Sequence, residues 1–439
     1  MTRHVFIIGL DDLHLAEARS IRGAEDIVFH GLIPYHDIVH PSAYPIEALL
    51  ATGRAEMAEA PSVDAIIGHW DFPTTSLLPI LRREHGLPGP TLESVLLCEN
   101  KYWGRLAHAA AVPECTPPFA LVDPAAPDAA ERLPLSPPFW LKPTVAFSSY
   151  LGFRIETAEQ YRDAIVQVRD NIGLFAEPFA EIAAHAEHPE ALPGEGGGDA
   201  CIAEGIIGGE LCTLEGYVLD GDVQVYGVLD SLRGSNNVSF LSYQLPSHLP
   251  GEVQARMADA AARVLRHIGL DDTPFNMEFF WDRESDRVWL LEINPRISKS
   301  HCALFRLVMG ASHHEVAVNV AFKRRPDFPR RDGPFPMAGK FMPRTYGDAV
   351  VLRVPGPDDI AAVAADFPEM VLHMHIQEGT RLSDLPAQDS YSFEIADLFI
   401  GAGDEAALHD KFHTIMERLD FRFSEVVPTN YGRARADTG

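Results

Sequence analysis

The chain has 439 residues, 46% of them hydrophobic, and a formal net charge of −27. This length and apolar content predict a packed protein of roughly two to four domains, and the strong acidity disfavours nucleic acid and anionic membranes as partners. Five cysteines without CxxC or zinc-finger spacing favour a reducing compartment over a disulfide framework or structural zinc. The first residues reach an acidic pair before any long apolar run, so we expect a cytoplasmic protein without signal peptide or bilayer-spanning segment.

Strand and helix signals alternate through the first hundred residues. The clearest are the strands HVFIIGL (4–10) and VDAIIGHW (63–70) and the helix TTSLLPILRREHG (74–86). This alternation predicts a parallel α/β domain over residues 1–98. The turn after the first strand holds only Gly9, lacks a GxGxxG pattern, and continues into Asp11 and Asp12. Two acids there would repel a pyrophosphate, which argues against a dinucleotide site.

A second region is expected over residues 99–325. Its predicted elements are a helix capped by Asn100, a strand within PFWLKPTVAF (138–147), a helix over 158–172, a hairpin turning at Asp220-Gly221, and a helix over 251–269. The Pro- and Arg-rich stretch 323–336 predicts a boundary, and residues 326–439 mix short strands with one closing helix, 404–421. The third domain is therefore expected to be α+β.

The segments FNMEFFW (275–281) and RVWLLEINPR (287–296) predict a β-hairpin. If its turn centres on Ser285, the apolar pairs are Trp281 with Trp289, Phe279 with Leu291, and Met277 with Ile293. On the opposite face, Glu278 would lie opposite Glu292, and Asn276 opposite Asn294.

Two carboxylates that face each other in a sheet repel unless one is protonated or a cation lies between them. Hard oxygen ligands suit Mg²⁺, with Mn²⁺ as the alternative, and Asn294 adds a neutral oxygen. Because Mg²⁺ usually completes its shell with water and substrate phosphates, Glu278 and Glu292 suggest a nucleoside triphosphate site. The competing interpretation is a solvent-facing hairpin with incidental acids.

Several further motifs follow one another in an order that resembles the ATP-grasp superfamily. Lys101 resembles the first phosphate lysine of that family, and Lys142, at a strand end, resembles the second. The loop TVAFSSYLG resembles the one that cradles the β- and γ-phosphates, with Ser148 and Ser149 but fewer glycines than usual. A strand-end lysine beside proline is also compatible with plain surface.

The stretch AEGIIGGE resembles the hinge of that family, where the adenine ring binds. The resemblance places Glu204 at the adenine amine, the backbone of Ile206 and Ile207 at the adenine edge, and Glu210 at the ribose hydroxyls. Read without the resemblance, the same residues are a strand, a Gly-Gly turn and a second strand.

The segment LLEINPRIS carries the most specific resemblance. It implies that Glu278, Glu292 and Asn294 hold Mg²⁺ and that Arg296 points at the transferred phosphate or the acyl oxygen. The implied fold is an N-terminal parallel α/β pre-ATP-grasp domain, an ATP-grasp domain of two α+β subdomains, and a small mixed C-terminal domain helping to form the substrate pocket. This domain order is similar to that of biotin carboxylase.

The resemblance implies an ATP-dependent carboxylate–amine ligase, similar to those that join L-amino acids, which acts through an acyl phosphate and releases ADP and phosphate. Small-molecule acids and amines would be its partners, and a homodimer is implied by the resemblance alone. In the bicarbonate-using branch a Val-Glu-His follows the motif, whereas this chain has Ser300-His301, which counts against bicarbonate. Ser298 and His301 are candidate substrate contacts, although a packed or surface histidine is the more common role for a residue such as His301. A third interpretation is a nucleotide-binding sensor or scaffold without catalysis.

Overall fold

The computed structural model describes residues 2–39, 41–126, 133–146, 150–234, 236, 239–385, 388 and 392–428. The chain divides into two compact units. The first comprises Met1–Val228, Leu249–Lys299 and His313–Phe328, and the second comprises Leu229–His248, Ser300–Ser312 and Pro329–Gly439. The three domains predicted from the sequence stay a prediction. No helix among the described residues is both long and apolar enough to cross a membrane.

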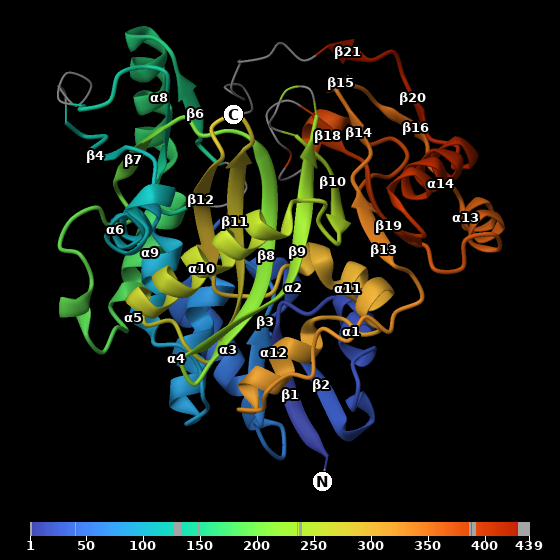
Figure 1. The fold of residues 1–439 in the computed structure, drawn as a ribbon, viewed down its shortest axis with the longest axis horizontal. Coiled ribbons are helices and arrows are strands. Elements are labelled where there is room, and N and C mark those ends of the chain that lie inside the picture. The colour runs from blue at the N-terminus through green and yellow to red at the C-terminus, as the bar shows by residue number, and fades with distance from the viewer. Residues whose placement is uncertain are drawn as a thin grey trace. The chain divides into compact units, whose positions relative to one another are not determined.

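A three-stranded parallel sheet in the order β2-β1-β3 forms the N-terminal part of the first unit (Figure 1). The elements here are β1 (Arg3–Ile8), α1 (Asp12–Arg19), β2 (Ile27–Leu32), α2 (Tyr35–Ile38), α3 (Ile46–Ala58), β3 (Ala65–Gly68), α4 (Thr74–Glu84) and α5 (Leu92–Glu99). The predicted parallel α/β arrangement is confirmed. Strand β2 was not predicted, because His30 and Gly31 interrupt its apolar run.

A small antiparallel sheet in the order β4-β7-β5-β6 follows in the same unit. Its elements and neighbours are α6 (Lys101–Ala111), β4 (Phe119–Val122), β5 (Phe139–Pro143), β6 (Phe153–Ile155), α8 (Ala158–Asn171), α9 (Gly173–Ala183) and β7 (Cys201–Gly205). Helix α6 begins where predicted, because the Asn100 side chain accepts hydrogen bonds from the amides of Tyr102 and Trp103. Apolar residues of α8 pack on this sheet.

A second antiparallel sheet of the first unit has the order β12-β11-β8-β9 (Figure 1). Its elements are β8 (Glu210–Leu219), β9 (Asp222–Arg233, of which the first part lies in this unit), α10 (Gly251–Ile268), β11 (Thr273–Asp282) and β12 (Arg287–Asn294), and α12 (His314–Ala321) follows. Helix α10 covers one face through a core that includes Met257, Met277 and Phe279. Asp220 and Gly221 both have positive φ, as the predicted hairpin turn requires.

The hairpin of β11 and β12 follows the predicted register over only half its length. Asn276 pairs with Asn294, Met277 with Ile293, and Glu278 with Glu292, as predicted. Beyond Glu278 the register shifts by one residue, so Phe279 pairs with Leu290, Phe280 with Trp289, and Trp281 with Val288.

The predicted Phe279–Leu291 and Trp281–Trp289 pairs are therefore wrong. The cause is a β-bulge that leaves Leu291 as the extra residue of β12. Because of the bulge, the side chains of Val288 and Leu290 enter the core together with that of Ile293. Trp289 lies on the other face, where the guanidinium carbon of Arg287 stacks over its ring, 4.1 Å from the ring centroid.

The second unit is α+β, as predicted for the C-terminal region. The last part of β9 continues into an antiparallel sheet in the order β9-β10-β13-β19-β17. Its elements are β10 (Phe240–Leu245), α11 (Cys302–Met309), β13 (Met337–Phe341), β14 (Arg344–Thr345), β15 (Gly347–Asp348), β16 (Val351–Arg353), α13 (Pro357–Ala364), β17 (Val371–Met374), β18 (Phe393–Glu394), β19 (Ala396–Ala402), α14 (Glu405–Arg418), β20 (Arg422–Phe423) and β21 (Val427–Pro428). The predicted closing helix is α14, whose Leu408 and Ile415 are fully buried.

Candidate active site

The two acids predicted to bind metal lie opposite each other on adjacent strands. Because Met277 and Ile293 enter the core, Glu278 and Glu292 extend from the other face of the hairpin, and both are partly exposed. Asn294 lies two residues beyond Glu292 on the same face. The side-chain Nδ2 of Asn294 donates a hydrogen bond to Asn276 Oδ1 over 3.2 Å. This hydrogen bond turns the side-chain oxygen of Asn294 away from Asn276.

A buried polar network supports this face from below. Asn276 donates to Glu215 Oε1 over 2.8 Å, and the same carboxylate lies 3.7 Å from His313 Nδ1. Tyr226 Oη is 3.1 Å from His313 Nδ1. Burial raises the pKa of Glu215, although His313 and the hydrogen bond from Asn276 counteract the effect. The chain of contacts from Glu215 through Asn276 fixes the orientation of Asn294, and the sequence analysis did not identify it.

One of the two lysines predicted to bind phosphate, Lys101, lies within electrostatic range of Glu292 and of the second lysine, Lys142. Lys101 is the first residue of α6, and its Nζ donates to the carbonyl oxygen of Ala146. Burial lowers the pKa of Lys101, and Lys142 acts in the same direction, whereas the charges of Glu292 and Glu204 raise it. Lys101 of α6 therefore interacts electrostatically with charged side chains of three strands: Lys142 of β5, Glu204 of β7 and Glu292 of β12.

Glu204 is tied into a buried ion-pair network. Its carboxylate accepts from Arg105 Nε over 2.7 Å and lies 2.5 Å from Lys142 Nζ. Arg105 also donates to the backbone oxygens of Leu290 and Leu291, over 2.8 and 3.1 Å. Burial opposes ionisation of Glu204, yet Arg105 and Lys142 outweigh it and lower the pKa to about 2.

Arg105 was not among the predicted site residues. Its spacing could have revealed it, because it follows Lys101 by four positions and so lies on the same face of α6. Through it, the bulge of β12 at Leu291 is bonded to the helix that begins with Lys101.

The predicted hinge residues form the connection between β7 and β8. Ile206 is exposed and Ile207 partly buried, while Glu210 begins β8 and pairs with Arg283 over 2.9 Å. Ser148 and Ser149 lie outside the described residues.

Arg296 follows β12 and is held by an acid of the N-terminal part of the chain. Its Nε donates to Asp71 Oδ1 over 2.7 Å, and its Nη2 donates to the same oxygen. Burial alone would lower the pKa of Arg296, but Asp71 outweighs this and raises it. Sequence analysis missed Asp71, although it lies just beyond the carboxyl end of parallel strand β3, where ligands of α/β sheets commonly bind.

The two candidate substrate residues belong to different units. In the first unit, the backbone oxygen of Ser298 lies 2.9 Å from His313 Nε2. In the second, His301 is 3% exposed and packs edge-on against Tyr243 with ring centroids 5.0 Å apart. This contact gives His301 a packing role.

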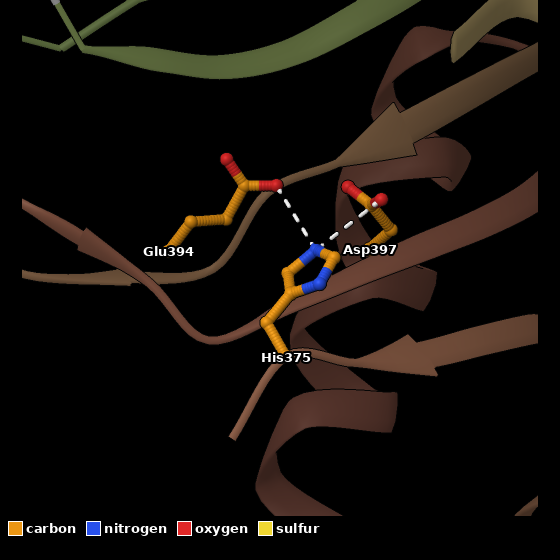
Figure 2. A group of neighbouring side chains, drawn as sticks. All are labelled: His375, Glu394 and Asp397. Atoms are coloured by element: carbon orange, nitrogen blue, oxygen red, sulfur yellow. Dashed lines mark ion pairs between the residues drawn. The ribbon is translucent and has the colours of Figure 1, made fainter. Parts of the chain in front are cut away.

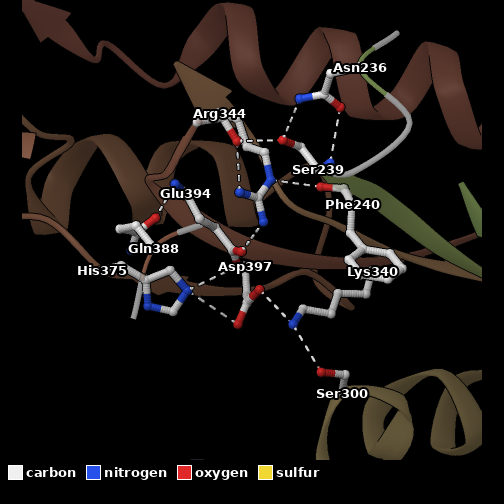
Figure 3. Close-up of polar contacts among 11 residues, drawn as sticks. Asn236, Ser239, Phe240, Ser300, Lys340, Arg344, His375, Gln388, Glu394 and Asp397 are labelled. Atoms are coloured by element: carbon white, nitrogen blue, oxygen red, sulfur yellow. Dashed lines mark hydrogen bonds and ion pairs between the residues drawn. The ribbon is translucent and has the colours of Figure 1, made fainter. Parts of the chain in front are cut away.

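The second unit contains a separate polar cluster. His375 Nε2 lies between Glu394 and Asp397, at 3.4 and 3.3 Å (Figure 2). Lys340 Nζ is 2.7 Å from Asp397, and Arg344 Nη2 is 2.5 Å from Glu394 (Figure 3).

One imidazole and two carboxylates are a plausible ligand set for a divalent cation. Burial would lower the pKa of His375, but Asp397 and Glu394 outweigh it and raise the pKa to about 9. A protonated imidazole has no lone pair to offer, and two basic side chains already neutralise the acids. In this structure the cluster is a network of ion pairs between the two acids and the basic side chains of His375, Lys340 and Arg344.

Comparison with known proteins places this geometry in context. Residues 135–304 match the family model described as ATP-grasp domain. No curated protein matches the sequence at a significant level.

The chain resembles many solved structures, among them the following three, which it matches over nearly its whole length. The L-amino acid ligase from Bacillus licheniformis is 15% identical, with a TM-score of 0.75, 97% of this chain and 99% of that one being covered. The phosphoribosylglycinamide synthetase from Anaerococcus prevotii is 13% identical, with a TM-score of 0.62 and coverages of 97% and 100%. The biotin carboxylase domain of 2-oxoglutarate carboxylase from Hydrogenobacter thermophilus, solved as a dimer with MgADP, ADP and bicarbonate, is 15% identical, with a TM-score of 0.62 and coverages of 96% and 91%. At these identities the similarity establishes the fold.

Proposed function

Because residues 135–304 of this chain match the ATP-grasp domain family, we propose that the protein is an ATP-dependent ligase that couples a carboxylate to an amine. The first substrate's carboxylate oxygen attacks the γ-phosphorus of ATP, the bond to the bridging oxygen breaks, and ADP leaves. The amine nitrogen of the second substrate then attacks the acyl carbon, and phosphate leaves. Amino acids are the substrate class we favour for both positions.

The observation that supports the proposal most directly is the meeting of opposite charges in the first unit. Glu278 and Glu292 pair across the hairpin, while Lys101 and Lys142 approach from α6 and β5. Two facing acids beside two lysines suit a polyanion that carries a divalent cation, because each charge then meets its opposite.

The residues fit Mg²⁺ as well. Glu278, Glu292 and the carbonyl oxygen of Asn294 are hard oxygen donors on one face, and Asn276 orients the last of them. When bound, the ion would neutralise negative charge on the phosphates.

The protein's own side chains would then position the reacting groups. Lys101 and Lys142 neutralise phosphate charge, and the ion pair with Glu204 holds the Lys142 side chain in place. Arg296, held by Asp71, presents a fixed cation to the developing negative charge at the acyl centre. Losing one such preorganised group typically costs about 10²–10³ in rate.

Phosphate release tests the proposal. Purified protein is incubated with ATP and Mg²⁺ and with pools of amino acids, and with carboxylate substrates labelled with ¹⁸O. We expect release that requires both an acid and an amine, with one ¹⁸O atom transferred to each phosphate. Glu292→Gln should abolish release, whereas Glu284→Gln, at the exposed turn of the same hairpin, should not.

Two outcomes would overturn the proposal. Phosphate release driven by bicarbonate alone would instead support a carboxylase. Binding of ATP with no release across all pools of acids and amines would support a nucleotide sensor.

A further inference from the structure

Glu99 is a carboxylic acid of the candidate site that was not among the residues predicted from the sequence. It is the last residue of α5, directly before the Asn100 cap and Lys101. Its side chain is partly exposed, and its Oε1 accepts a hydrogen bond from Thr75 Oγ1. Thr75 lies in the first turn of α4, four residues after Asp71. Glu99 therefore directly precedes α6 and is hydrogen-bonded to the first turn of α4, the helix that follows the Asp71 loop.

Charges from three other segments act on this carboxyl group. They are Asp71 from the loop after β3, Lys101 from α6, and Arg296 from the segment after β12. Burial has the largest effect and raises the pKa of Glu99 to about 7, with Asp71 adding to the rise while the Thr75 hydrogen bond, Lys101 and Arg296 oppose it. A carboxyl group with such a pKa exchanges protons readily at neutral pH.

The other acids near the site are less able to accept a proton. Glu204 has a pKa of about 2 because Arg105 and Lys142 hold it ionised against burial. Asp71 is committed to Arg296, and Glu215 is fully buried within its own network. Glu278 and Glu292 are the proposed metal ligands.

Three buried histidines of the first unit are also unsuitable. Burial lowers the pKa of His69, His108 and His314 well below the ordinary value, and each is at most 3% exposed. They are too weakly basic and too enclosed to take a proton from a substrate ammonium group.

We propose that Glu99 is the catalytic proton acceptor for the amine substrate. This inference rests on the proposed ligase function. An amino acid enters with its amine as an ammonium ion, which has no lone pair. Glu99 takes one proton, the free amine attacks the acyl phosphate, the C–N bond forms, and the C–O bond to phosphate breaks. The second N–H proton leaves with the phosphate, and Glu99 returns its proton to solvent.

Hydroxylamine separates this role from the first chemical step. It is already unprotonated at neutral pH and traps acyl phosphates as hydroxamates without a proton acceptor. We expect Glu99→Gln to lose about 10²–10⁴ in kcat for amide formation from an amino acid. The same variant should form hydroxamate at nearly the wild-type rate, which would also show that it folds. Glu93→Gln, on the same helix, is the matched control and should match the wild type in both reactions.

Thr75→Val provides a second and independent readout. The Thr75 hydroxyl favours the ionised form of Glu99, so its loss should move the acidic limb of the kcat/KM profile for the amine to higher pH. The limb for hydroxamate formation should not move.

Three results would overturn the inference while leaving the proposed function intact. They are amide formation at the wild-type rate in Glu99→Gln, an equal loss of hydroxamate formation in that variant, and an unmoved amine profile in Thr75→Val. Failure of the wild type to release phosphate with any acid and amine would instead overturn the proposed function.

Discussion

Replacing Arg105 by methionine should destabilise the protein strongly, because its guanidinium neutralises a buried acid and satisfies two backbone oxygens. The side chains of Arg105 and Glu204 are only 2% and 5% exposed. Removing one partner of such a pair leaves an uncompensated buried charge and typically costs about 3–5 kcal/mol. The carbonyls of Leu290 and Leu291 lose their donor as well.

The pKa of Glu204 gives an independent magnitude. Its fall from an ordinary 4.5 to about 2 corresponds to about 3 kcal/mol of stabilisation at neutral pH. Because the folded pKa is depressed, this contribution is complete above pH 4.5 and is lost as the pH falls toward 2. Lys142 supplies part of it. We therefore expect Arg105→Met to lose about 3 kcal/mol at pH 7, and the loss to shrink by about 2 kcal/mol at pH 3.

Urea denaturation followed by tryptophan fluorescence at the two pH values measures this loss. Arg263→Met is the control, because Arg263 pairs with Glu114 on the surface, where both side chains are at least 40% exposed. Such a pair contributes about 0–1 kcal/mol. A loss below about 1 kcal/mol for Arg105→Met, or a loss that is equal at pH 7 and pH 3, would refute the electrostatic explanation.

Three further variants or titrations test other parts of the molecule. Asn100→Ala removes the acceptor for two helix amides, so the free energy of unfolding should fall by about 1–2 kcal/mol in urea denaturation, and an unchanged value would rule out the cap. Asp71→Asn should lower kcat by at least about tenfold with little change in KM for ATP, because it frees Arg296 from its only described ion pair; an unchanged kcat would contradict the positioning role. Because Asp397 and Glu394 raise the pKa of His375 to about 9, NMR titration should find its imidazole protonated at pH 7.5 and deprotonated as the pH rises through 9. The stabilising contribution of His375 should be lost over the same rise in pH. A midpoint near 6.5 would disprove the network of ion pairs around His375.

The local features of the fold could be predicted from short stretches of sequence. The cap at Asn100, the end of α10 at Gly269 and the turn at Asp220-Gly221 each depend on side chains or φ angles within a few residues. The pairing of Glu278 with Glu292 was also predictable, because alternation in two neighbouring strands fixes which side chains share a face.

The bulge at Leu291 limited that prediction. A single extra residue in β12 reverses the alternation, and both phases place apolar side chains in the core, so the hydrophobic pattern of VWLL could not distinguish them. The bonds from Arg105 to the carbonyls of Leu290 and Leu291 join this site to α6, a segment that lies far away in the sequence.

Most helices and strands, the class of fold and the residue types that suit a nucleotide and a metal ion could be predicted from the sequence, because these depend on periodicity, capping and local spacing. The pairing of those side chains became visible in the folded chain alone: Lys142 pairs with Glu204, and Arg296 with Asp71. It also brought Glu99 within electrostatic range of Arg296. Ionisation in a buried site depends on groups that approach from distant segments, and no local pattern encodes that distance.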